Sequence, residues 1–146
     1  MTDTPGGQVI TQTFEISIAP MGAPRQTRAD SWKKRPVVLR YRAYKDALRL
    51  ACRGVTMEPI EVMVHAYIAM PDSWSNKKRL EMCGKACRSK PDWDNIGKGV
   101  CDALWEQDSV IADGGVRKRW SSEDRLTITV RSEPVFTYGA KLRAIA

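Results

Sequence analysis

The chain has 146 residues, enough for one domain with a single core. Its 24 lysines and arginines outnumber its 17 aspartates and glutamates, and the resulting net charge of +7 favours a polyanionic partner, either nucleic acid or an anionic membrane surface. A hydrophobic content of 42% excludes wholesale disorder, and no apolar run of about 18 residues is present to cross a bilayer.

The N-terminus and the cysteines indicate a reducing compartment. The first eight residues are polar and lack the basic start and apolar stretch of a secretory signal, so we expect a cytoplasmic protein with reduced thiols. Of the four cysteines only Cys83 and Cys87 are closely spaced, and His65 is the single histidine. Scattered core or surface thiols are therefore favoured over a structural zinc site.

The N-terminal third predicts a strand, a basic loop and a helix. Residues 13–19 alternate apolar and polar side chains, which is typical of a strand with one buried face. Residues 38–53 then show helical spacing, with an expected buried stripe of Leu39, Ala43, Ala47, Leu50 and Ala51. The loop between them carries Trp32 and five basic side chains: Arg25, Arg28, Lys33, Lys34 and Arg35.

The middle and the C-terminal part predict three more strands and a short helix. Residues 60–70 are apolar on nearly both faces, which favours a central strand, and Ser75 or Asn76 is a plausible cap for a helix over residues 77–84. That helix is basic, with Lys77, Lys78 and Arg79. Strands are expected at 116–120 and 125–131, with a hairpin turn at Asp113-Gly114. We expect one α/β domain over residues 1–146, with 1–10 and 133–146 as peripheral tails.

The acidic residues are concentrated in one segment of this basic chain. Six of the 17 acids fall between residues 92 and 113, around a helix predicted over residues 93–105 with the apolar stripe Trp93, Ile96, Val100 and Leu104. Asp94, Lys98 and Asp102 share another face at spacings of four. Helix capping and an ordinary row of ion pairs explain these acids as well as a functional site does.

A functional site of these residues would bind a metal ion. Mg²⁺ prefers oxygen ligands, and Asp92, Asp94 and Asp108 can supply them if the loop after Trp105 folds back over the start of the helix. Such an ion would polarise a phosphate and acidify a bound water. Lys98 would contact a phosphate oxygen or the leaving group as a point charge. A hydrolase based on histidine has little support, because the single histidine lies in a predicted strand.

The motif Lys90-Pro-Asp-Trp-Asp-Asn-Ile-Gly-Lys98, continued by Asp102-Ala-Leu and by Asp108-Ser-Val-Ile, resembles the RusA family of Holliday-junction endonucleases. The resemblance implies a mixed sheet of about four strands packed against two to three helices, in a homodimer that cuts four-way DNA junctions by paired symmetric cleavage with Mg²⁺ or Mn²⁺. It makes Asp92, Asp94 and Asp108 the metal ligands and Lys98 a catalytic lysine.

The chain departs from the family pattern at two places. Gln107 stands where many members have a second acid, and the segment from Leu104 to Asp108 is short. The resemblance also implies a bacterial or phage-encoded protein and assigns DNA binding to two basic segments, the first with Arg25, Arg28, Lys33, Lys34 and Arg35, the second with Lys77, Lys78 and Arg79. Trp32 or Trp74 could stack on bases, although packing in the core is the more common role.

Two alternatives stay open. The chain could be a module that binds junctions or other branched DNA without cutting it, with structural acids. It could also be a structure-specific nuclease that uses the same centre on another nucleic-acid substrate.

Overall fold

The computed structural model describes residues 9–25, 27–31 and 35–133, and a four-stranded mixed sheet lies at its centre. In chain order the strands are β1 (Ile10–Ile16), β2 (Glu61–Ala69), β3 (Asp113–Ser121) and β4 (Arg125–Ser132), and in space their order is β1-β4-β2-β3. β4 pairs antiparallel with β1 and β2, whereas β2 and β3 are parallel. The expected central position of the second strand is confirmed. Ile10, expected in a peripheral tail, instead opens the first strand.

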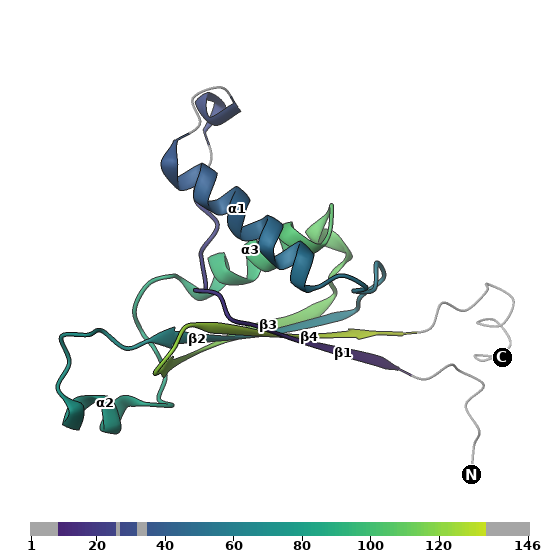
Figure 1. Ribbon diagram of the computed structural model, residues 1–146. Helices are drawn as coiled ribbons and strands as arrows, with labels where there is room; N and C mark the ends of the chain where they lie inside the picture. Colours follow the sequence, from purple (N-terminus) through teal and green to yellow (C-terminus); the bar gives the residue numbers. More distant parts are fainter. Residues whose placement is uncertain (1–8, 26, 32–34, 134–146) are drawn as a thin grey trace, which may run out of the picture.

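Three helices complete the α+β fold, as the fold class predicted. Figure 1 shows α1 (Pro36–Ala51) and α3 (Trp93–Leu104) on one face of the sheet, with α2 (Asn76–Met82) beyond one end of it. Two short 3-10 turns, η1 (Arg28–Ser31) and η2 (Asp108–Val110), lie in the loops. No helix in the described ranges has the length and apolar character needed to cross a membrane.

The main core lies between the sheet and the two helices on its covered face. β2 and β4 bury Val62, Val64, Ala66, Leu126, Ile128 and Val130 there, and α3 adds Ile96, Val100, Ala103 and Leu104. Complete burial of one such aliphatic side chain contributes roughly 1.5–3 kcal/mol. Ile96, Val100 and Leu104 of the stripe predicted for this helix are therefore confirmed in the core, and Trp93 is not.

The buried face of α1 differs from the expected stripe. Val38, Tyr41, Tyr44 and Leu48 are the buried residues of this helix, whereas Leu39 and Leu50 are 45% and 64% exposed. The ring centroids of the two tyrosines lie 6.5 Å apart over the core. The large rings bury more apolar area than the alanines of the predicted stripe, so they determine which face turns inward.

The predicted hairpin at Asp113-Gly114 is wrong. Both residues lie in β3, and β2 separates β3 from β4 in the sheet. Gly114 has φ of +146°, and a Cβ there would lie 2.0 Å from the carbonyl oxygen of Val62. The glycine therefore permits a close approach between parallel strands, and not a two-residue turn.

Glycines also let α3 pack closely on both of its sides. A Cβ at Gly97 would lie 3.1 Å from Val116 of β3, and one at Gly99 would lie 3.2 Å from the carbonyl oxygen of Met21. On the same side as Met21, the amide of Ala23 donates to the carbonyl oxygen of Asn95 at 3.1 Å. The helix is therefore held between the third strand and the loop that follows β1.

A second, smaller core anchors α2. Met70, Cys87 and Trp120 are buried together there, and the ring of Trp74 meets that of Trp120 edge-on with centroids 4.9 Å apart. Ser75 caps the helix, because its side chain accepts a hydrogen bond from the amide of Lys78. The hydrogen bond confirms the predicted cap. The contact with Trp120 assigns Trp74 to packing instead of base stacking.

An ion pair organises the loop before α1. Arg35 donates to both carboxylate oxygens of Asp30, from Nε at 2.6 Å and from Nη2 at 2.7 Å, and the amide of Thr27 donates to the same carboxylate at 2.6 Å. Asp30 is only 4% exposed. These hydrogen bonds, from Arg35 first and Thr27 second, lower the pKa of Asp30 below its ordinary value of 3.8.

We predict that Asp30→Asn destabilises the protein near neutral pH and that the difference from wild type shrinks in acid. Because the pKa of Asp30 is lowered in the folded state, its contribution is present above pH 3.8 and is lost as the pH falls below that value. Thermal unfolding at pH 7 and at pH 3 measures this. The control Asp46→Asn removes an exposed carboxylate and should give no such pH-dependent difference; a pH-independent difference for Asp30→Asn would contradict the prediction.

Candidate active site

Two carboxylates stand at the start of α3, as the motif predicts, and both are exposed. Asp92 occupies the N-cap position, yet its side chain makes no capping hydrogen bond; Lys90 Nζ donates to its Oδ2 at 2.8 Å instead. Asp94 follows in the first turn. The capping explanation therefore fails for Asp92.

Asp94, Lys98 and Asp102 lie along one side of α3, as their spacing predicts, but they do not form a row of ion pairs. Within the described part of the chain, neither Asp94 nor Lys98 has a side-chain hydrogen bond or an ion pair. Asp102 accepts a hydrogen bond from the Tyr41 hydroxyl at 3.0 Å. Asp102 therefore serves the contact between α1 and α3, while the other two charges have no such partner among the described residues.

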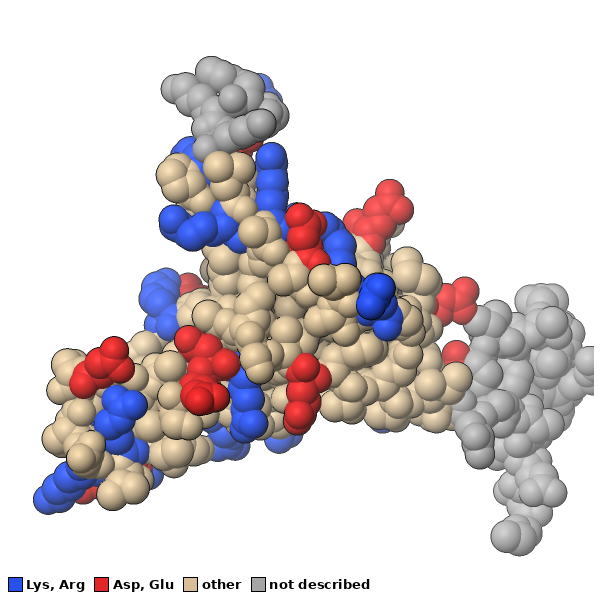
Figure 2. Space-filling model, in the orientation of Figure 1, with Lys and Arg blue, Asp and Glu red and all other residues tan. Residues whose placement is uncertain are grey.

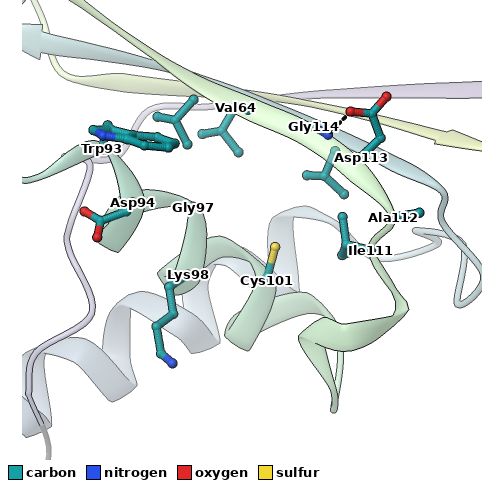
Figure 3. Close-up of a pocket in the computed structure, with 13 residues that line it drawn as sticks. Val64, Trp93, Asp94, Gly97, Lys98, Cys101, Ile111, Ala112, Asp113 and Gly114 are labelled. Carbon is teal, nitrogen blue, oxygen red and sulfur yellow. Dashed lines mark hydrogen bonds between the residues drawn. The ribbon is translucent and has the colours of Figure 1, made fainter.

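Two neighbouring grooves lie beside the start of α3. The first runs between α3 and the β2–β3 edge of the sheet and includes Trp93, Asp94, Lys98 and Cys101. Figure 3 shows the Trp93 ring and the Cys101 thiol directed toward the sheet, whereas Asp94 and Lys98 point away from it. The acid and the lysine thus form the outer rim of this groove, and the indole lies inside it.

The second groove brings the two carboxylates together with cations. Asp92, Trp93 and Asp94 line it on one side, and Arg88 and Lys118 line it with them. Lys118 comes from β3 and also donates to the carbonyl oxygen of Ser89. Neither cation was among the predicted site residues; the alternation of β3 could have identified Lys118, because it faces the same way as Val116.

Asp108 does not join the other two carboxylates in the single chain. It begins η2, after the C-terminal end of α3, and lines neither groove. Burial first, and then the charges of Asp108 and Asp102, raise the pKa of Cys101 to about 11. Among residues 9–25, 27–31 and 35–133, no three His, Cys, Asp or Glu side chains converge as a metal site.

The predicted DNA-binding residues divide into several groups. Lys77 and Lys78 are exposed on α2, with Lys78 Nζ 4.3 Å from the centre of the Trp74 ring. Arg25 shares a hollow with Lys98 and Asn95 on the other side of α3. Figure 2 shows lysine and arginine side chains over α2 and around the N-terminal half of α1, with acidic side chains between these regions.

Other members of the predicted set have structural partners. Arg35 is committed to Asp30, and Arg79 Nη1 donates to the carbonyl oxygen of Pro71 at 2.9 Å. Arg28 lies in η1 and also has a partner. Trp32, Lys33 and Lys34 fall outside the described residues.

Trp93 is the clearest departure from the expected site. The sequence assigns it to the buried stripe of α3, and Ile96 and Val100 of that stripe are indeed 0% exposed. Trp93 itself is 62% exposed. Its ring lies in an open groove beside the sheet, and the helical period alone could not reveal this exposure.

Comparison with known proteins identifies the family of the chain. Residues 17–131 match the family described as Endodeoxyribonuclease RusA, and this span includes both grooves. A curated relative, the uncharacterized protein YqaN of Bacillus subtilis (strain 168), is 40% identical over 81 residues. That alignment covers 50% of this chain and 57% of the relative, so the chain spans little more than half of that protein. The chain belongs to the RusA family of endodeoxyribonucleases.

Proposed function

We propose that this protein is a Mg²⁺-dependent endodeoxyribonuclease that resolves four-way DNA junctions by two symmetric phosphodiester cuts. One observation carries the proposal: Asp92 and Asp94 are exposed in one groove, and neither is used to cap α3 or to pair along it. Two adjacent anions repel each other, and a bridging cation removes that cost. Family membership supports the nuclease activity.

The two carboxylates suit a hard divalent cation. Mg²⁺ is commonly held by one or two carboxylates, with water and phosphate oxygens completing its ligands. Asp92 and Asp94 would hold it, and Mn²⁺ accepts the same oxygen ligands. When bound, the ion supplies positive charge to the phosphate and acidifies a water. Lys90, which pairs with Asp92 here, would be free to contact a phosphate instead.

Lys98 is the proposed phosphate partner on the protein side. Its ammonium group lies one turn after Asp94 on the same side of α3 and has no ion pair with a described residue. A free ammonium at this place can neutralise charge that develops on the scissile phosphate or on the leaving oxygen.

Asp108 is proposed as a third carboxylate on the strength of the family motif. It begins η2 and lines neither groove in the described structure, so this role requires it to approach Asp92 and Asp94. Asp102 is not among the proposed catalytic residues, because it accepts a hydrogen bond from the Tyr41 hydroxyl.

The proposed DNA path follows the cations around the acids. Arg88 and Lys118 line the groove of the two carboxylates, and α2 adds Lys77 and Lys78 beyond them. Arg25 lies with Lys98 on the opposite side of the helix. Contacts of this kind to phosphates set affinity and orientation, and not sequence choice.

Since a junction needs two equivalent cuts, we propose a homodimer with one site per subunit.

We predict that Asp94→Asn lowers Mg²⁺-dependent cleavage of a synthetic four-way junction by about 100-fold or more, since the loss of a ligand carboxylate removes several kcal/mol of transition-state stabilisation. Binding of the junction without metal should persist. The control Glu58→Gln changes an exposed acid outside both grooves. Equal cleavage by Asp94→Asn and wild type would end the catalytic assignment of Asp94, whereas junction binding by a wild type that does not cut would favour the non-catalytic binding module. Asp108→Asn should lose cleavage equally if Asp108 is a ligand.

We also predict that a four-way junction is cut in preference to linear duplex, flapped DNA or an RNA hairpin of matched length. The measurement is a competition with equal concentrations of labelled substrates and Mg²⁺. Preferential cutting of the flap or the RNA would support the alternative of a structure-specific nuclease with another substrate.

For the basic path, we predict that the double variant Lys77→Ala, Lys78→Ala binds DNA with a weaker salt dependence. The negative slope of log affinity against log salt concentration should become shallower by about 2, because each phosphate contact contributes about 0.9. Binding titrations at several salt concentrations measure the slope. Arg53→Ala removes an exposed charge just after α1 and serves as the control. An unchanged slope in the double variant would place α2 away from DNA.

A further inference from the structure

We infer that Trp93 stacks on an unpaired nucleobase next to the scissile phosphate and so favours branched over linear DNA. The inference rests on the proposed function for the position of the phosphate. It assigns a specificity role to a residue that belongs to neither the proposed ligand set nor the core.

The first reason is the exposure of the indole. Trp93 is 62% exposed, and it is the one aromatic side chain among the exposed large apolar residues of the described chain. Tryptophan is highly buried on average, because leaving its ring in water is costly. In the described structure no ring or cation stacks on Trp93, whereas Trp74 contacts both Trp120 and Lys78. The indole is therefore available to an external partner.

The second reason is its place between the two acids. Trp93 follows Asp92, precedes Asp94, and lines both grooves. Its ring is directed into the groove toward the sheet, while Asp94 points outward (Figure 3). A phosphate held at the two carboxylates would therefore have an aromatic side chain on the residue between its ligands.

The third reason is the composition of the space beside the ring. Val64 and Val116 provide apolar walls in the first groove, and Gly97, which packs closely on Val116, lines it one turn along the helix. The volume of this groove is about 490 Å³, within the range of about 300–1,000 Å³ that binds small ligands. Arg88 and Lys118 stand beside the ring in the second groove and suit the phosphates on either side of a base.

An exposed indole in this groove favours a base that has an uncovered face. A paired base in continuous duplex has both faces covered by its neighbours, whereas a base at a branch point can expose one face. Stacking on an aromatic side chain tolerates any base and discriminates by whether a face is free. Trp93 would thus contribute to the choice of a junction, while the cations bind any duplex.

The test measures binding without metal, so that no DNA is cut. We expect Trp93→Ala to weaken binding of the four-way junction about 10-fold to 100-fold, the range that alanine substitution at a stacking aromatic gives, and to change duplex binding less than about 2-fold. Trp93→Phe should restore most of the loss. Leu50→Ala is the matched control, because Leu50 is 64% exposed on α1, outside both grooves.

A spectroscopic readout separates stacking from a structural effect. With 2-aminopurine at the branch point, wild type should quench the fluorescence of the base and Trp93→Ala should not, while thermal unfolding of the variant stays unchanged. Equal weakening of junction and duplex, or no weakening, would overturn the inference. So would conversion of a dimer to a monomer by Trp93→Ala in sedimentation, which would assign the indole to a second copy of the chain.

The two proposals can fail separately. If wild type binds the junction and quenches the probe through Trp93 but does not cut with Mg²⁺, the nuclease proposal fails and stacking stands. If Trp93→Ala binds and quenches as wild type does while wild type cuts the junction, stacking fails and the nuclease proposal stands.

Discussion

The parallel pairing of β2 and β3 is the constraint on which the rest of the structure depends. Parallel neighbours cannot be joined by a tight turn, so the chain must leave one end of β2 and return to the other. The returning segment contains α2, both carboxylates and all of α3. The same connection therefore completes the sheet, covers one face of it and carries the candidate active site.

Close packing of α3 fixes the position of the candidate site within this connection. Gly97 and Gly99 let the helix approach β3 and the loop after β1, and Ile96 and Val100 bury the face between them. A rigidly held helix presents its first turn in a defined orientation, with the ring of Trp93 toward the sheet and the carboxylate of Asp94 away from it. The backbone that carries these side chains therefore loses little further conformational freedom on binding.

The charge distribution suits a nucleic-acid substrate. Basic side chains would bind its phosphates, and the two carboxylates would lie at one place along it. Arg88 and Lys118 line the groove of the two carboxylates, and further exposed lysines lie on α2, in a protein of net charge +7. Without a cation the two acids would repel phosphate. The same contrast gives each group a separate part in the proposed function: affinity for the basic side chains, metal binding for the acids, and recognition of an open base for Trp93.

The sequence by itself determined the four strands, the three helices, the central place of β2 and the motif of residues 92–98, because period, capping and spacing are local properties. Only the tertiary structure decided which face of α1 is buried, that β2 separates β3 from β4, and that Asp92 does not cap its helix. It also decided the exposure of Trp93 and the absence of Asp108 from the groove of the other two acids. Each of these depends on which distant segments lie against a residue, and a helical or strand period carries no information about them.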